Sequence, residues 1–457
     1  MTANVFVVGL DEPNREILRA LPGAGDYRFL TLLDLDEIGQ EREMDMPALL
    51  SLASRRLDSF DGPVDAIIGL WDFPVSSLVP LLCRPRGLPC APLEAVVRCE
   101  HKYWSRLEQR AAVPEAVPRF AVIDLRSPVE PEGLSYPLWV KPVKSFSSEL
   151  AFRVTDSAEY ASAVGRIREG AARVGAPFQW VMDQIRAPSA IRSVGGTAGL
   201  AEEEATGDQL TVEGYVRDGV PHSYALVDSL LYPGTPSFLC YEYPSRAPEW
   251  VRDRLFDLTD RVITRVGLDD TTFNVEYFHD PETDAVTLLE INPRHSQSHA
   301  RLFEFVRGVS NHEIALRIAL GEEPVLEREG RGAMAAKWFV RSFRDGFLSA
   351  VPAPEDVARA EARVPGARVE VTARAGRWLS ELPIQDSYSF ELADVFVVGR
   401  DAEECEREFH ACARELSFTI VGVEEEDRPR RGPGDDENRQ RTAQRGARGR
   451  SRPHPAQ

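Results

Sequence analysis

The sequence predicts a mixed α/β (α+β) protein built from more than one domain. Near the amino terminus, short apolar strands alternate with helical patterns in the order typical of a parallel α/β sheet. The strands fall at 4–9, 27–33 and 64–70, and the helices at 14–21 and 47–60. Residues 271–280 and 287–292 read as two strands joined by a polar turn, which predicts an antiparallel hairpin. Residues 333–422 again alternate apolar strands with turns.

The amino-terminal α/β region offers one candidate ligand-binding edge. Its first strand is followed by GLDEPN rather than by G-x-G-x-x-G, so a dinucleotide site is not expected there. Residues 70–77 follow the third strand at its carboxyl end, where open α/β sheets bind ligands. Asp72 and Ser76 are therefore candidate substrate contacts, although capping of the next helix is the favoured role for Ser76.

The hairpin carries the most informative pattern of the chain. Glu290, Asn292 and Arg294 occupy alternate positions, and a strand has a side-chain period of two, so all three point from one face. A hairpin centred on the polar turn pairs residues whose numbers sum to about 564. Glu276 is then expected opposite Leu288 and one diagonal step from Glu290, on the same face.

This group of polar side chains predicts a binding site for a metal-bound nucleotide triphosphate. Two neighbouring carboxylates repel each other unless a cation lies between them. Hard oxygen ligands in this number suit Mg²⁺, which takes one or two carboxylates together with substrate phosphates. Ordinary surface acids on an exposed hairpin are the alternative, but two glutamates, an asparagine and an arginine in phase favour the metal site.

These residues resemble the last motif of the ATP-grasp superfamily, an E-[IMF]-N-x-R strand preceded by an acidic strand. The resemblance implies that Glu276, Glu290 and Asn292 bind Mg²⁺, with Mn²⁺ as the alternative ion, and that Arg294 acts catalytically on phosphate or an acyl phosphate. The cofactors implied are ATP and Mg²⁺.

The resemblance also implies the domain order of that superfamily. The expected parts are a pre-ATP-grasp α/β domain, a nucleotide-binding domain with a small lid at about 113–205, and a β-rich closing domain; they cover residues 1–97, 98–324 and 325–422. Residues 423–457 contain almost no apolar side chains and are expected to be a disordered, solvated tail, with contact to RNA or an acidic partner as the less favoured alternative.

Two lysines match nucleotide-binding positions of the superfamily. Lys141 ends the apolar strand YPLWV, and the corresponding lysine of the motif contacts the α and β phosphates, so it is expected to bind ATP and support catalysis. Lys102 lies in the segment 93–120, which has helical periodicity and then a Val-Pro break, and which resembles the helix that presents an earlier nucleotide-binding lysine. Lys144 is an alternative to Lys141, and a solvated lysine is the alternative for each position.

A serine-rich loop follows Lys141. Ser145, Ser147 and Ser148 take the place of the small residues of the family's flexible loop. Serine hydroxyls and backbone amides can cap phosphate oxygens, so these residues are expected to contact ATP. An ordinary polar turn is the alternative.

The adenine hinge is matched by LAEEEATGDQLTVEGYV. On that match Glu202 and Glu203 meet the adenine amino group, and Gln209 stands where an acid normally holds the ribose hydroxyls. The segment 178–185 is the alternative hinge strand. The later segment is preferred because Gly207 follows at the expected distance, which leaves an insertion near 185–199.

Composition narrows the class of protein. The net charge of −19 disfavours binding to nucleic acid, and six cysteines without a C-x-x-C pair argue against zinc and against a disulfide framework. No 18-residue apolar run and no secretion signal is present, so a cytoplasmic enzyme is expected. The expected partners are small-molecule carboxylate and amine substrates, with a homodimer left open.

The resemblance implies an ATP-dependent carboxylate-amine ligase that forms an amide through an acyl phosphate and releases ADP. A biotin-type carboxylase is the first alternative; its motif continues N-x-R-x-Q-V-E-H, but here Ser296 and Ser298 replace the Gln and the Glu. A non-catalytic ATP-binding scaffold is the second, and the complete metal set argues against it. His295 and His299 follow the strand that carries Glu290 and Asn292, and they either line the acceptor pocket or pack the loop.

Overall fold

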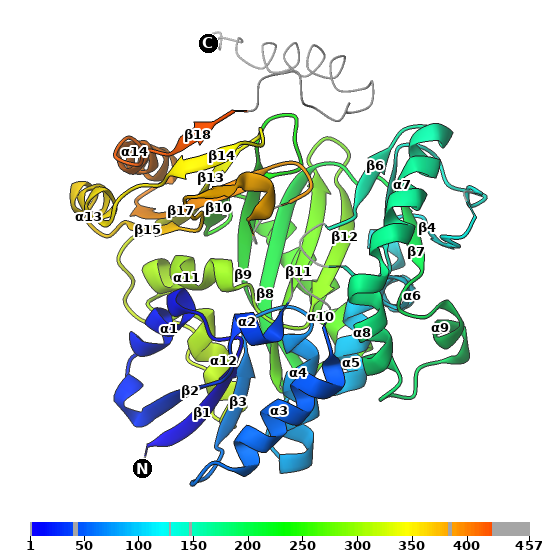
Figure 1. The fold of residues 1–457 in the computed structure, drawn as a ribbon, viewed down its shortest axis with the longest axis horizontal. Helices are drawn as coiled ribbons and strands as arrows, with labels where there is room; N and C mark the ends of the chain where they lie inside the picture. Colours follow the sequence, from blue (N-terminus) through cyan, green and yellow to red (C-terminus); the bar gives the residue numbers. More distant parts are fainter. Residues whose placement is uncertain (1, 40–43, 128, 146–148, 383–385, 423–457) are drawn as a thin grey trace, which may run out of the picture.

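The computed structural model describes residues 2–39, 44–127, 129–145, 149–382 and 386–422. Figure 1 shows the amino-terminal part in blue at the bottom, a small sheet with its helices at one side, and a large curved sheet that continues into the carboxyl-terminal elements at the top.

The amino-terminal part is a parallel three-stranded sheet, as the alternating pattern predicts. Its order is β2 (Tyr27–Leu33), β1 (Ala3–Val8), β3 (Ala66–Gly69). One face packs against α3 (Met46–Asp58) and α4 (Val75–Cys83), and the other against α1 (Glu12–Arg19) and the more distant α12 (Asn311–Ala319). The short helix α2 (Leu35–Ile38) follows β2. β3 therefore lies beside α12, a segment from the far part of the chain.

The helical part expected before the Val-Pro break of segment 93–120 forms two helices. α5 (Leu93–Glu100) ends at His101, whose backbone is extended, and α6 (Lys102–Ala112) begins directly afterwards. The imidazole of His101 accepts a hydrogen bond from the Trp104 amide at 3.2 Å and so caps α6. This break places Lys102 in the first turn of a helix rather than in the middle of one.

The small sheet lies between α6 and the large sheet in sequence. Its antiparallel order is β4 (Phe120–Ile123), β7 (Gly199–Glu203), β5 (Leu138–Pro142), β6 (Phe152–Val154), and α7 (Ser157–Gly170) packs on it. The alternative hinge strand at 178–185 is wrong, because most of that segment belongs to α8 (Ala172–Met182). The expected insertion contains α9 (Ser189–Val194), and its Ile191 packs with Phe178 in the amino-terminal core.

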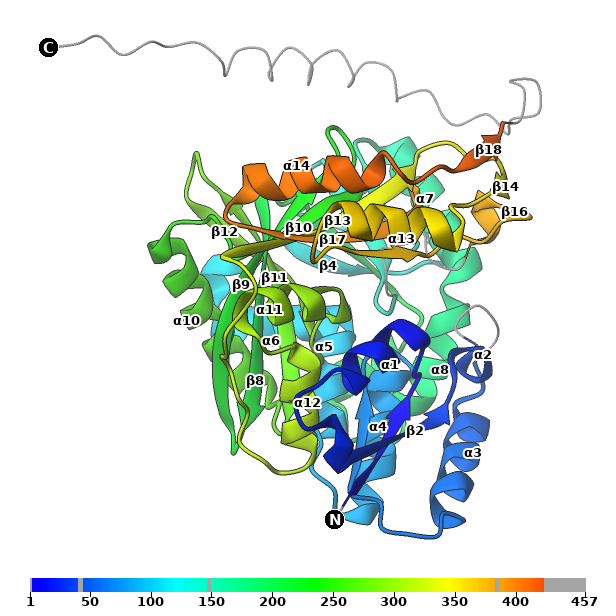
Figure 2. The same ribbon diagram turned by 90° about the vertical axis from the view of Figure 1, so that its left-hand side faces the viewer.

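The large sheet has eight antiparallel strands in the order β12-β11-β8-β9-β10-β13-β17-β15. The strands are β8 (Asp208–Arg217), β9 (Val220–Leu231), β10 (Phe238–Tyr243), β11 (Thr271–Asp280), β12 (Ala285–Asn292), β13 (Met334–Ser342), β15 (Arg368–Val371) and β17 (Phe390–Gly399). Helix α10 (Glu249–Val266) covers one face, and α11 (Ala300–Arg307) covers the other (Figure 2).

The carboxyl-terminal residues extend this sheet rather than forming a separate one. β13 pairs with β10, so β13, β17 and β15 continue the sheet that carries the hairpin. Helices α13 (Pro354–Arg363) and α14 (Ala402–Ala413) pack on these strands, and β14 (Phe347–Ala350), β16 (Arg377–Trp378) and β18 (Thr419–Val421) form a further small sheet. Within the described ranges, no helix is long and apolar enough to span a membrane.

Candidate active site

The two glutamates of the hairpin lie directly opposite each other. β11 pairs Glu276 with Glu290, not with Leu288 as the hairpin register predicts, and Tyr277 takes the position opposite Leu288. The difference arises at Leu289, an extra residue that forms a bulge in β12. The bulge also changes the phase of the strand, so that Leu288 packs in the core while Glu290 faces the other way.

A buried arginine, which the sequence patterns did not single out, contacts this bulge. Arg106 on α6 donates to the carbonyl oxygens of Leu288 at 2.7 Å and Leu289 at 2.9 Å. The same guanidinium binds both carboxylate oxygens of Glu202, at 2.6 and 3.1 Å. Arg106 therefore links β12, at its bulge, to β7 of the small sheet. The available signal was its spacing, one helical turn after Lys102 on the same face.

Two amide side chains next to the glutamates contact the carboxylate of Glu276. Asn292 donates to Asn274 Oδ1 at 2.9 Å and to Glu276 Oε1 at 3.2 Å, and Gln209 donates to Glu276 Oε2 at 3.0 Å. Gln209, which was expected at the ribose hydroxyls, thus contacts the carboxylate of Glu276. Burial, followed by repulsion from Glu290, raises the pKa of Glu276 to about 7.

Lys102 joins the first turn of α6 to the metal strand. Its ammonium lies 2.6 Å from Glu290 Oε1 and donates to the carbonyl of Ser145 at 3.3 Å. Burial disfavours the charged form of Glu290, but Lys102 keeps the pKa of this carboxyl below its usual value. Ser145 is buried next to this lysine, whereas Ser147 and Ser148 lie outside the described residues.

Lys141 on β5 faces the same region from the small sheet. Its ammonium lies 2.7 Å from Glu202 Oε2, and burial lowers the pKa of Lys141 even though Glu202 opposes the shift. Burial also acts on Glu202, yet Arg106 and Lys141 together lower its pKa to about 2. The Glu202 side chain therefore holds two cations. Glu203 points elsewhere and accepts from the Ser135 amide at 2.9 Å.

Lys144 belongs to a second buried pair. Its ammonium lies 3.0 Å from Glu100 Oε2 and about 5.1 Å from the ring centres of Phe73 and Phe178. The expected helix-capping role of Ser76 is wrong, because Pro74 occupies the cap position and no side chain caps α4. Ser76 instead donates to Glu100 Oε1 at 2.5 Å, so it supports the carboxylate that binds Lys144.

Arg294 connects the hairpin to the amino-terminal sheet. Its guanidinium donates to both oxygens of Asp72, at 2.8 and 2.6 Å, and Asp72 follows the carboxyl end of β3. Burial opposes ionisation of Asp72, but Arg294 holds the pKa of this carboxyl below its usual value. Asp72, which was expected to be a substrate contact, thus lies beside Arg294 at the end of the hairpin.

The two histidines after the metal strand are buried in the loop packing. His295 contacts Thr272 Oγ1 at 2.9 Å and His312 at 3.2 Å, and His312 contacts Asn14 of α1 at 2.8 Å. His299 lies 2.9 Å from Glu213 Oε1, which also accepts from the Ser296 amide. Their geometry favours the packing alternative.

The charges of the site fit a divalent cation. Each lysine and arginine named above is paired with a carboxylate, whereas Glu276 has only amide donors and no ion pair among the residues the structure describes. Two opposed carboxylates and an amide oxygen supply the hard ligands that Mg²⁺ prefers. Glu276, Glu290 and Asn292 would hold it.

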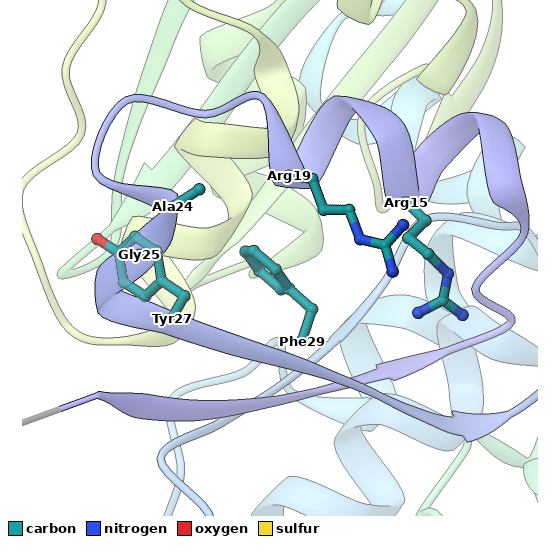
Figure 3. Close-up of a pocket in the computed structure, with 6 residues that line it drawn as sticks. All are labelled: Arg15, Arg19, Ala24, Gly25, Tyr27 and Phe29. Atoms are coloured by element: carbon teal, nitrogen blue, oxygen red, sulfur yellow. The ribbon is translucent and has the colours of Figure 1, made fainter.

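A separate shallow pocket, shown in Figure 3, is formed by the amino-terminal part alone, between α1 and β2. Its cations already have partners: Arg15 donates to Thr31 at 2.7 Å and Arg19 to Glu12 at 3.4 Å. None of the site residues lines it.

One segment of the chain matches a known family of ATP-binding domains. Residues 246–326 match the family model described as the ATP-binding domain of the carbamoyl-phosphate synthase L chain. A search of curated protein sequences finds no match. Among solved structures, an L-amino acid ligase from Bacillus licheniformis is similar at a TM-score of 0.71 and 18% identity, over 92% of this chain and 99% of that one.

Two carboxylases are similar in the same way. A biotin carboxylase from Campylobacter jejuni, in complex with a β-γ-ATP, has a TM-score of 0.63 at 13% identity, over 92% of this chain and 93% of that chain. The biotin carboxylase domain of the Hydrogenobacter thermophilus 2-oxoglutarate carboxylase, in complex with MgADP, has a TM-score of 0.62 at 14% identity, over 92% and 91%.

The fold is that of the ATP-grasp proteins, as the strand motif predicts. The segment that matches the ATP-binding family model contains the hairpin of β11 and β12.

Proposed function

We propose that the protein is an ATP-dependent carboxylate-amine ligase that requires Mg²⁺ and joins its substrates through an acyl phosphate. The observation that supports this proposal most directly is the opposed pair Glu276 and Glu290, with Lys102 on one carboxylate and amide donors on the other. This arrangement concentrates oxygen ligands and positive charge where a triphosphate chain needs both.

The reaction follows from these groups. Mg²⁺ bound by the hairpin would neutralise charge on the phosphate oxygens. The substrate carboxylate attacks the terminal phosphorus of ATP, the bond from phosphorus to the ADP oxygen breaks, and an acyl phosphate forms. The amine nitrogen then attacks the acyl carbon, phosphate leaves, and the nitrogen loses its extra protons.

The protein contributes position and charge rather than a nucleophile. Lys102 and Lys141 reach the site from α6 and β5 and are assigned to the phosphates of ATP. Arg294 is assigned to the transferred phosphoryl group, and Asp72 holds its guanidinium in a bidentate contact. The connection from β7 to β8, with Glu202, Glu203 and Gly207, is assigned to the adenine, and Ser145 with Ser147 and Ser148 to the phosphates.

The carboxylase alternative is weaker at one residue. Where the biotin-type motif has a glutamate, this chain has Ser298, which accepts a hydrogen bond from Lys337 at 3.2 Å. A serine hydroxyl cannot act as a base toward bicarbonate at neutral pH. A non-catalytic scaffold has no need for a complete set of metal ligands and phosphate-binding lysines.

The test is a condensation assay. The protein is incubated with ATP, Mg²⁺ and pooled carboxylic acids and amines, and the products are identified by mass spectrometry. The proposal expects ADP release that depends on both an acid and an amine, with one condensed product for each ADP. Release of ADP that depends on bicarbonate and biotin instead would support the carboxylase.

A further inference from the structure

A second cluster of buried charges lies on the same sheet face as the metal ligands. The pairing register forms one row across five strands: Gln209 pairs with Ser229, Ser229 with Tyr241, Tyr241 with Lys337, and Lys337 with Phe396. Residues directly opposite in an antiparallel sheet project to the same face. The Gln209 side chain contacts Glu276. The row that includes Tyr241 and Lys337 therefore lies on the same face of the sheet as Glu276.

Lys337 and Asp394 form the centre of this cluster. Asp394 lies two residues from Phe396 on β17, so it shares that face. The Lys337 ammonium lies 2.8 Å from Asp394 Oδ2 and donates to Ser298 Oγ at 3.2 Å, and both charged residues are 5% exposed. Ser298 follows the metal strand by a few residues, so the cluster adjoins the end of the catalytic hairpin.

Two hydrogen-bonding positions in the cluster are unused among the described residues. Asp394 Oδ1 is buried and has no hydrogen-bond partner. The Lys337 ammonium makes two polar contacts, which leave its third N–H without a hydrogen bond, and it lies 4.5 Å from the ring centre of Phe339. An ion pair that only joined β13 to β17 would be expected to satisfy the whole carboxylate, since buried polar atoms are normally hydrogen bonded. A charged acceptor without a hydrogen bond, next to a charged donor with one N–H not hydrogen bonded, is what recognition of a zwitterion requires.

Tyr241 connects this cluster to the metal hairpin. Its ring lies 5.0 Å from that of His299 and 4.9 Å from that of Phe339, and the residue is partly exposed. Burial and then the negative charge of Glu276 raise the pKa of Tyr241, and Asp394 acts in the same direction. The phenol is therefore within electrostatic reach of both groups.

We infer that the Lys337–Asp394 cluster binds the amine substrate and that this substrate is a zwitterion of the amino-acid type. Its carboxylate would accept from Lys337 and Ser298, and its ammonium would donate to Asp394 Oδ1. The acid substrate must bring its own carboxylate to the metal ligands, so the cluster beyond Tyr241 is left for the second substrate. This inference rests on the proposed ligase function.

The test separates the two substrates with hydroxylamine, which traps an acyl phosphate as a hydroxamate without an amine-binding site. Wild-type protein is assayed with ATP, Mg²⁺ and each acid of a panel plus hydroxylamine, and then with single amino acids or their decarboxylated amines. We expect the amino acids to be condensed and the decarboxylated amines to react about 100-fold more slowly, because they leave Lys337 without its anion.

The variants are Asp394→Asn and Lys337→Met, with Ser298→Ala as a milder change at a partly exposed position. Each is expected to raise the KM for the amino acid about tenfold or more while the hydroxamate rate stays within about twofold of wild type. The matched control is Glu242→Gln. Glu242 is similarly buried, is also in an ion pair, with Arg246 at 2.9 Å, and neighbours Tyr241 on the opposite face of β10, so its change should leave both rates alone.

Equal loss of hydroxamate and amide formation in the variants would overturn the inference, as would a rise in the KM of the acid alone. Efficient use of decarboxylated amines by the wild type would contradict it too. If wild-type protein formed no hydroxamate with any acid, the ligase proposal itself would fail, and the inference with it. If Asp394→Asn failed to fold, Ser298→Ala and the choice between amino acids and amines would decide the question.

Discussion

Arg294 and Asp72 are 222 residues apart in the chain and meet through two hydrogen bonds of 2.6 and 2.8 Å. The contact joins the amino-terminal sheet to the end of the metal strand. It fixes the plane of the one guanidinium assigned to the transferred phosphoryl group, because a carboxylate that binds both nitrogens leaves little rotational freedom.

Asp72→Asn should therefore impair catalysis more than stability. The amide keeps one acceptor but loses the bidentate contact and the charge, so kcat is expected to fall about 10- to 100-fold while the free energy of unfolding falls by about 1–2 kcal/mol. Steady-state kinetics and denaturant unfolding measure the two effects. Asp58→Asn is the control, since Asp58 pairs with Arg86 on the surface; an equal loss of kcat there would contradict the assigned role.

Glu290→Gln should preserve the fold and nearly abolish ligation. The glutamine keeps the size and one oxygen ligand but removes the charge that faces the metal, which typically costs about 100- to 1000-fold, or about 3–4 kcal/mol. Glu276→Gln should behave similarly, and the double variant should lose much less than the product of the two, because both act through the same metal. Raised Mg²⁺ should restore part of the activity in each single variant. Normal turnover of Glu290→Gln at ordinary Mg²⁺ would withdraw the metal assignment.

Arg106→Lys should disturb the bulge in β12. A lysine keeps the charge but cannot hold Glu202 and two carbonyls together, so we expect a loss of about 2–4 kcal/mol in the free energy of unfolding and a fall in activity beyond the stability loss. Thermal unfolding and Mg²⁺ titration of ADP release are the measurements. Arg110→Lys, on the exposed side of the same helix, should cause neither the loss of stability nor the fall in activity. Unchanged Mg²⁺ dependence in Arg106→Lys would show that the bulge does not need this contact.

The buried histidines predict a stability that falls on acidification. Burial lowers the pKa of His312 to about 3, and burial followed by His312 lowers that of His295. In the unfolded chain both titrate near 6.5, so the unfolded state binds more protons below that pH. Their contribution is complete above pH 6.5 and declines as the pH falls, by about 1.4 kcal/mol per pH unit for each histidine.

His312→Gln should reduce by one the number of protons that the chain takes up on unfolding at acidic pH, even if it lowers stability at pH 7. Denaturant unfolding between pH 7 and 5 measures the slope. The exposed His410, changed to Gln, is the control. An unaltered slope in His312→Gln would mean that this histidine does not titrate on unfolding.

The parallel amino-terminal sheet, the hairpin and the strands at 334–342 and 390–399 could be predicted, because their apolar periodicity is local. The register of the hairpin could not. It depends on one extra residue, Leu289, and the contact to Arg106 that accompanies it spans 183 positions. The hydrogen bond between Ser76 and Glu100 could not be predicted either, because it joins two separate helices.

The Lys337 cluster shows a different limit. A lysine and an aspartate on strands read from sequence as solvent-facing residues, and only the pairing of β10, β13 and β17 shows that they are buried together on the metal-binding face. The histidines after the metal strand were left between two roles, because their partners Thr272, His312 and Asn14 lie on three separate elements.

The most direct test of the ligase account follows the oxygen of the acid. An acid substrate labelled with ¹⁸O in its carboxyl group is turned over with ATP and Mg²⁺, and the nucleotide and phosphate are analysed by chromatography and mass spectrometry. The account predicts ADP and a phosphate that carries one ¹⁸O atom, because the carboxylate oxygen attacks the terminal phosphorus and leaves with it. AMP and pyrophosphate, or phosphate without the label, would contradict the acyl-phosphate mechanism.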